Sequence, residues 1–147
     1  GACRNGTALA SLFIDAPYNR SNFCLVGTSA VQLSAAATQL TQAALQLVDL
    51  HHHAASHPRL GVVDHISCHP LGSLAPPTHR GSSAQDGMGL QQAASLAQAI
   101  GSQLGSGESP LPVFLYGAAH PQRQSLADIR QALGYFSGAT QGDCIDA

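Results

Sequence analysis

Short apolar runs alternate along this chain with longer segments of helical periodicity, and no other feature of the sequence restricts the possible folds as strongly. Over residues 30–50, apolar side chains recur every three or four positions, as on the buried face of an amphipathic helix. The predicted order is strand, strand, helix, strand, helix, strand, helix, over residues 11–15, 22–27, 30–50, 60–68, 88–104, 112–117 and 125–133. Because helices interleaved with strands bury their apolar faces against a sheet, we expect a layered α/β arrangement.

Turn-forming residues indicate how these elements are connected. Residues 16–20 contain a proline and an asparagine between two apolar runs, and this pattern predicts a β-hairpin over residues 11–28. Residues 72–87 are rich in Gly, Ser and Pro, which favours a long exposed loop rather than a domain boundary. We therefore expect a single domain over residues 1–147.

Two of the helices carry capping signatures. Ser29 is followed three residues later by Gln32, and Ser125 is followed at the same spacing by Asp128. Gly134 stands where a glycine commonly ends a helix. These residues mark the expected ends of the first and last helices.

The composition excludes several classes of function. Only 10% of the residues are charged, the net charge is −2, and all six basic residues are scattered arginines, so the chain lacks the basic stripe of a nucleic-acid-binding protein. No apolar run approaches the ~20 residues of a membrane span, and the first seven residues do not resemble a secretory signal. We expect a soluble intracellular protein without a nucleic-acid partner.

Neither the cysteines nor the histidines form a recognised metal-binding motif. The four cysteines are Cys3, Cys24, Cys68 and Cys144. They are widely separated without a Cys-x-x-Cys pair, so we expect reduced thiols. The eight histidines include residues 51–53 and the i, i+4 pairs His53/His57 and His65/His69. A solvated helix end explains the first group, whereas a structural metal is the alternative; we expect no metal.

The segment over residues 56–66 is the best candidate for chemistry. His57 precedes a φ-restricting proline, Arg59 and Gly61, and the segment then enters an apolar stretch. A loop histidine can act as a general acid or base near neutral pH, and an arginine suits an anionic substrate. A turn with a hydrogen-bonded histidine and a surface ion pair explains the same residues. Other catalytic motifs are missing, since the sequence has neither a Gly-x-Ser-x-Gly elbow nor a phosphate-loop lysine.

Three blocks of sequence carry a resemblance to a known family. They are Tyr18-Asn19-Arg20 with residues 22–27, the segment over residues 56–65 that contains His57-Pro58-Arg59-Leu60-Gly61, and residues 114–119 with residues 125–136. In order and spacing they resemble the N-terminal subdomain of glutamate formiminotransferase, particularly the formiminotransferase-cyclodeaminase-like proteins of plants and algae. The resemblance implies an α+β fold, a two-layer α/β sandwich whose mixed β-sheet has helices packed on its face.

The resemblance also implies an activity and a set of site residues. In that family the histidine of the His-Pro-Arg motif is the catalytic acid/base, and it falls on His57. The implied reaction transfers a formimino group from N-formimino-L-glutamate to N5 of tetrahydrofolate, in histidine and one-carbon metabolism. Tetrahydrofolate is then a co-substrate, and no metal is required. Asn19, Arg20 and Arg59 are the implied substrate-binding residues, although Arg59 could instead brace the motif.

The length of the chain qualifies this expectation. The family opens with a strand and a helix before the strand that precedes Asn19, whereas only twelve residues precede Phe13 in this chain. We therefore expect this region to be abbreviated. In that case residues 11–28 do not form a direct hairpin. The family also continues beyond the match into a folate-contacting segment and a second subdomain. One expectation is therefore a catalytic half-site; the other, which we favour for the isolated chain, is a non-catalytic interaction or scaffold subunit with a protein partner or as a homo-oligomer.

Overall fold

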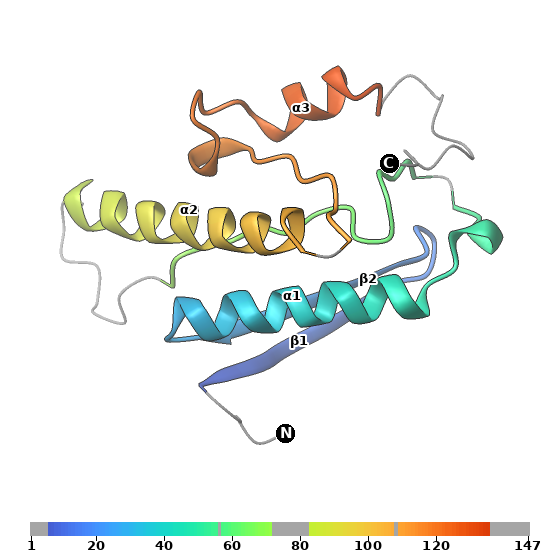
Figure 1. The fold of residues 1–147 in the computed structure, drawn as a ribbon, viewed down its shortest axis with the longest axis horizontal. Helices are drawn as coiled ribbons and strands as arrows, with labels where there is room; N and C mark the ends of the chain where they lie inside the picture. The colour runs from blue at the N-terminus through green and yellow to red at the C-terminus, as the bar shows by residue number, and fades with distance from the viewer. Residues whose placement is uncertain (1–5, 56, 72–82, 108, 136–147) are drawn as a thin grey trace.

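The computed structural model describes residues 6–55, 57–71, 83–107 and 109–135 (Figure 1). The elements are strands β1 (Thr7–Asp15) and β2 (Arg20–Gly27), helices α1 (Ala30–Leu47), α2 (Ser83–Gly105) and α3 (Leu126–Ala132), and the 3-10 turns Leu50–His52 and Gly117–Ala119. This mixture of a sheet and packed helices confirms the α+β class. Cys3 and Cys144 lie outside the described residues.

Strands β1 and β2 form an antiparallel hairpin whose register runs from Thr7 opposite Gly27 to Asp15 opposite Arg20. At the turn, the backbone N–H of Asn19 donates to the Ala16 carbonyl oxygen at 3.0 Å. The ladder is irregular between Leu9 and Ser11. The predicted hairpin is thus confirmed, and the alternative in which the two runs are not directly connected is wrong.

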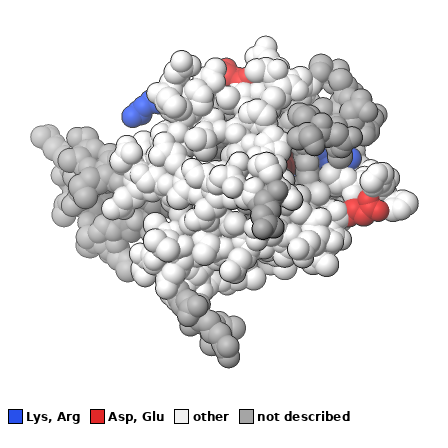
Figure 2. Space-filling view, viewed as in Figure 1, with Lys and Arg blue, Asp and Glu red and all other residues white. Residues whose placement is uncertain are grey.

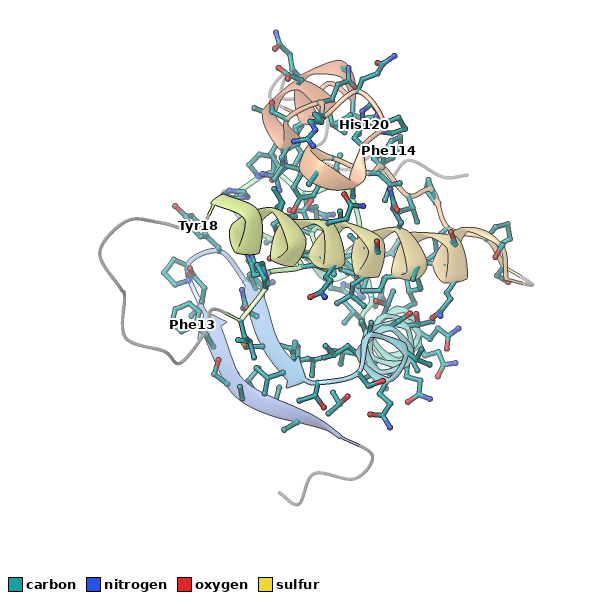
Figure 3. All side chains as sticks on the ribbon, turned by 90° about the vertical axis from the view of Figure 1, so that its left-hand side faces the viewer. Phe13, Tyr18, Phe114 and His120 are labelled. Carbon is teal, nitrogen blue, oxygen red and sulfur yellow. The ribbon has the colours of Figure 1, made fainter. Side chains whose placement is uncertain are left out.

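The helices are layered upon one another and upon the hairpin. Helix α1 runs along the strands, and α2 lies between α1 and α3 (Figures 1 and 3). The hydroxyl of Thr38 in α1 donates to Gln103 Oε1 in α2 at 2.8 Å. None of the helices within the described ranges is long and apolar enough to cross a membrane.

The core is centred on α2. The buried apolar side chains among the described residues are Ala93, Ala94, Ile100, Leu104, Ala119 and Tyr135. Ser34 and Thr41 of α1 are buried with them, which lets the two helix backbones approach closely. The amide Nε2 of Gln98 donates to the carbonyl oxygen of Ala119 at 3.0 Å and ties the segment before α3 to α2.

Two predicted strands and one predicted boundary are wrong. Residues 60–68 and 112–117 are not strands, because neither segment has a paired strand beside it in the described part of the chain. Their apolar side chains instead line a cavity of about 520 Å³ together with residues of all three helices. Helix α2 begins at Ser83 rather than at Met88, so residues 83–87 of the expected loop are helical. Residues 72–82 of that loop lie outside the described residues.

Candidate functional site

His57 lies in the loop that follows α1 and is half-buried. Its Nδ1 atom is 2.7 Å from the carbonyl oxygen of Pro58. Because a carbonyl oxygen only accepts hydrogen bonds, Nδ1 carries the hydrogen and donates. In the neutral imidazole the lone pair is then on Nε2, which makes Nε2 the atom that can accept a proton.

The turn of the β1–β2 hairpin lies beside His57. The ring centroid of Tyr18 is 4.9 Å from that of His57. The Arg20 guanidinium lies 5.3 Å from the Tyr18 ring centroid, within cation–π range. Asn19 Nδ2 donates to His53 Nδ1 at 3.1 Å. The hairpin therefore brings Asn19 and Arg20, both predicted from the sequence as substrate-binding residues, to the same end of the molecule as His57.

Arg59 is half-buried and makes no hydrogen bond or ion pair with the residues that the structure describes. The ion pair near the motif is formed by a different arginine. Arg130 Nη2 in α3 donates to Asp64 Oδ2 at 3.2 Å, and the two side chains are 19% and 21% exposed. The other carboxylate oxygen of Asp64 accepts the backbone N–H of Leu60 at 3.0 Å. Asp64 thus connects the His57 loop to α3.

Tyr135, which follows α3, completes the surroundings of His57. Its side chain is only 2% exposed. Its hydroxyl donates to the Pro58 carbonyl oxygen at 2.8 Å and lies 3.4 Å from His57 Nδ1. The Arg130 guanidinium lies 4.6 Å from the centroid of its ring. Burial and, to a lesser extent, the nearby Asp64 carboxylate raise the pKa of the Tyr135 hydroxyl, so the group stays protonated at neutral pH.

The predicted N-terminal cap of α3 is present and stabilises the first turn of the helix. The Ser125 hydroxyl accepts the backbone N–H of Asp128 at 3.1 Å, and the Asp128 carboxylate accepts the backbone N–H of Ser125 at 3.2 Å. The hydrogen bond from the Ser125 hydroxyl, with the backbone bond, lowers the pKa of Asp128. After the helix, Gly134 has φ 73°. A glycine adopts this left-handed conformation without the steric cost of a side chain, and the chain then turns so that Tyr135 is buried.

Several other histidines of the described residues have partners away from His57. His51, in the 3-10 turn after α1, contacts the Asp49 carboxylate through its backbone N–H at 2.9 Å and through Nδ1 at 2.7 Å. These exposed contacts agree with the interpretation of a solvated helix end. His65 Nε2 is hydrogen-bonded to the Tyr116 hydroxyl, and burial lowers the pKa of His65. No group of three or more potential ligands is placed to hold a metal ion within the described ranges.

Comparison with known proteins identifies the family. The model of the formiminotransferase domain, N-terminal subdomain, matches residues 2–145. The chain belongs to this family. A formiminotransferase cyclodeaminase-like protein of Arabidopsis thaliana is 34% identical over 139 residues, which cover 92% of this chain and 42% of the relative. A glutamate formimidoyltransferase of Streptococcus pyogenes serotype M1 is 32% identical over 135 residues, covering 90% of this chain and 39% of the relative.

This formiminotransferase subdomain spans less than half the length of both relatives. No solved structure matches the chain. Its candidate site residues all lie within the family match. The sequence prediction named His57, Arg59, Asn19 and Arg20 but assigned no role to Tyr135 or Asp64. Both residues stand in the blocks that carry the resemblance, yet only the fold shows that the Tyr135 hydroxyl contacts Asp64 Oδ2 as well as the Pro58 carbonyl oxygen.

Proposed function

We propose that the chain contributes to the transfer of a formimino group from N-formimino-L-glutamate to tetrahydrofolate, with His57 as general acid and base. The observation that carries this proposal is the hydrogen bond from His57 Nδ1 to Pro58, which leaves Nε2 as the basic nitrogen. The membership in the formiminotransferase family and the similarity to a glutamate formimidoyltransferase support it.

The reaction needs one group that both accepts and returns a proton. The N5 amine of tetrahydrofolate attacks the formimino carbon, a new C–N bond forms, and His57 Nε2 accepts the proton of the amine. The tetrahedral intermediate then collapses: the bond to the glutamate nitrogen breaks as the imidazolium returns the proton to it. Glutamate leaves, and the formimino group remains on N5. A single imidazole can perform both transfers, because it accepts a proton in its neutral form and donates one as the imidazolium.

The remaining predicted residues suit the substrates. Glutamate and folate both carry carboxylates, and arginine matches a carboxylate with two parallel hydrogen bonds. We assign Arg20 and Arg59 to carboxylate binding and the Asn19 amide to a polar group of the substrate. Arg59 has no ionic partner among the described residues, so its guanidinium is available for this role. The free thiols of Cys24 and Cys68 favour an intracellular location.

A turnover assay with formiminoglutamate and tetrahydrofolate tests the proposal. We expect His57→Ala to lower kcat by about 10²–10⁴-fold, the usual contribution of a positioned acid/base. The matched control is His52→Ala, because the His52 side chain is 90% exposed and its one ion-pair partner among the described residues is Asp49. Calorimetry with 5-formyltetrahydrofolate measures binding separately. Equal turnover of the two variants, or neither binding nor turnover by the unmodified chain, would count against catalysis by this chain.

A second candidate function is self-association through the hairpin, as a non-catalytic subunit of a larger assembly. Phe13 and Ile14 are 64% and 67% exposed, and because successive residues of a strand point to opposite faces, both faces of the hairpin are uncovered there. Phe13 projects from the hairpin away from α1 (Figure 3). Residues 7–14 contain no charge and no proline. In the described part of the chain, β1 pairs with β2 along one edge and with no strand along the other. Such an edge can pair with the same edge of a second copy.

Size-exclusion chromatography with light scattering tests this second candidate. The face in Figure 2 shows few charged side chains, which also favours association over repulsion between copies. We expect a dimer whose fraction rises with concentration and falls in Ile14→Lys, because a lysine on an edge strand opposes pairing. A monomer at all concentrations would exclude self-association.

A further inference from the structure

The Tyr135 hydroxyl lies at the centre of the polar contacts around His57, and the reaction described above assigns it no task. Among the described residues it reaches the Pro58 carbonyl oxygen at 2.8 Å, His57 Nδ1 at 3.4 Å and Asp64 Oδ2 at 3.5 Å. Tyr135 is among the most deeply buried large side chains of the described residues. A buried hydroxyl placed between a candidate catalytic histidine and the carbonyl that binds it is suited to control that histidine.

The lengths of these contacts show where the hydrogens lie. The hydroxyl has one hydrogen, and the shortest of its contacts is to the Pro58 oxygen, so it donates there. The same oxygen accepts the Nδ1 hydrogen of His57 at 2.7 Å. A carbonyl oxygen has two lone pairs and can accept both bonds. The Tyr135 oxygen, at 3.4 Å from Nδ1, is then a second and weaker acceptor for the same imidazole hydrogen.

We propose that Tyr135 is a positioning residue for His57, which holds the imidazole with its hydrogen on Nδ1 and its lone pair on Nε2. The expected effect on turnover rests on the proposed acid/base function of His57, whereas the expected tautomer does not. Tyr135 acts through the Pro58 carbonyl: by binding this group it fixes the direction in which the oxygen accepts from His57. If the carbonyl turned away, the imidazole would lose its acceptor, and the hydrogen could move to Nε2, where it would block proton acceptance.

Arg130 and Asp64 also contact Tyr135. Arg130 packs its guanidinium over the ring, and the same guanidinium binds Asp64, whose other oxygen accepts from Leu60 in the His57 loop. The tyrosine, the arginine and the loop therefore form a closed set of contacts. Because Tyr135 and His57 are 78 positions apart, the docking of the end of α3 determines the state of the imidazole.

The tautomer of His57 can be measured without any activity. Imidazole ¹⁵N–¹H correlation spectra of the full chain distinguish Nδ1–H from Nε2–H in the neutral ring. We expect the Nδ1–H form in the unmodified protein and a mixture with the Nε2–H form in Tyr135→Phe, which removes only the hydroxyl. Tyr116→Phe is the matched control, because Tyr116 binds His65 instead, and it should leave the His57 signals unchanged.

Turnover provides the second readout. We expect Tyr135→Phe to lower kcat roughly tenfold with KM for both substrates little changed, in line with the loss of one hydrogen bond that acts on the catalytic group. Thermal denaturation checks that the variant is folded. An Nε2–H form in the unmodified protein would overturn the proposal even if Tyr135→Phe did not fold, as would unchanged His57 signals in a folded variant. A shifted tautomer in a chain without turnover would support the positioning role while removing the proposed catalysis.

Discussion

The loop around His57 and the β1–β2 hairpin are stabilised in opposite ways. Around His57, polar groups are largely shielded from solvent and connected: Asp64, Arg130 and Tyr135 tie the loop to α3. In the hairpin, large apolar groups are exposed, and its order depends on the backbone ladder between the strands. The difference teaches that the candidate site is set by a few specific side-chain contacts, whereas the hairpin tolerates changes of side chain as long as its ladder is kept.

Two leucines provide the sharpest way to break this comparison. Leu104 of α2 is 8% exposed, whereas Leu12 of β1 is 50% exposed. We expect Leu104→Ala to lower the free energy of unfolding by about 3 kcal/mol, because it leaves a space in the core. Leu12→Ala should cost less than about 1 kcal/mol, because little apolar area returns to water. Urea denaturation of both variants measures the difference. Equal costs would show that the hairpin surface is covered in solution.

Removal of the Arg130 guanidinium tests the polar contacts around His57, and we expect a smaller effect on the free energy of unfolding. Arg130→Met keeps an apolar stem but leaves Asp64 Oδ2 without its ionic partner in a site that is only about one-fifth exposed. We expect a loss of about 2 kcal/mol in the free energy of unfolding, less than for a fully buried pair because water reaches both groups. Arg123→Met, which removes an exposed arginine from the turn before α3, should change stability by less than about 0.5 kcal/mol. If both variants are equally stable, the tether between the loop and α3 contributes nothing measurable.

Local signals predicted the elements whose stabilising groups are close in sequence. The Ser125–Asp128 capping box is present as expected, and the helix predicted over residues 30–50 is α1, which ends at Leu47. The hairpin was likewise predictable, because its turn and its two strands are contiguous. In each of these cases the hydrogen-bond partner of a backbone group stands within a few residues of it.

The predicted strands over residues 60–68 and 112–117 failed for the converse reason. Their β-branched and apolar residues do indicate burial, and both segments line the cavity among the helices. A strand also needs a neighbouring strand, however, and composition does not specify one. The same limit applies to the site. His57, Asn19 and Arg20 were predicted from the motifs, whereas the contact of Tyr135 with Pro58 joins residues 77 positions apart and depends on how α3 docks.

The backbone conformation of Asn19 restricts which residue types position 19 accepts. Its φ of 48° lies in the left-handed region, where asparagine and glycine are accommodated far more readily than branched residues. The same residue presents the amide that binds His53. Position 19 is therefore subject to two separate demands, one from the turn and one from the hydrogen bond to His53, and few residue types meet both. Glycine would preserve the path of the chain while deleting the amide, so the turn and the hydrogen bond to His53 can be separated at this position by a single substitution.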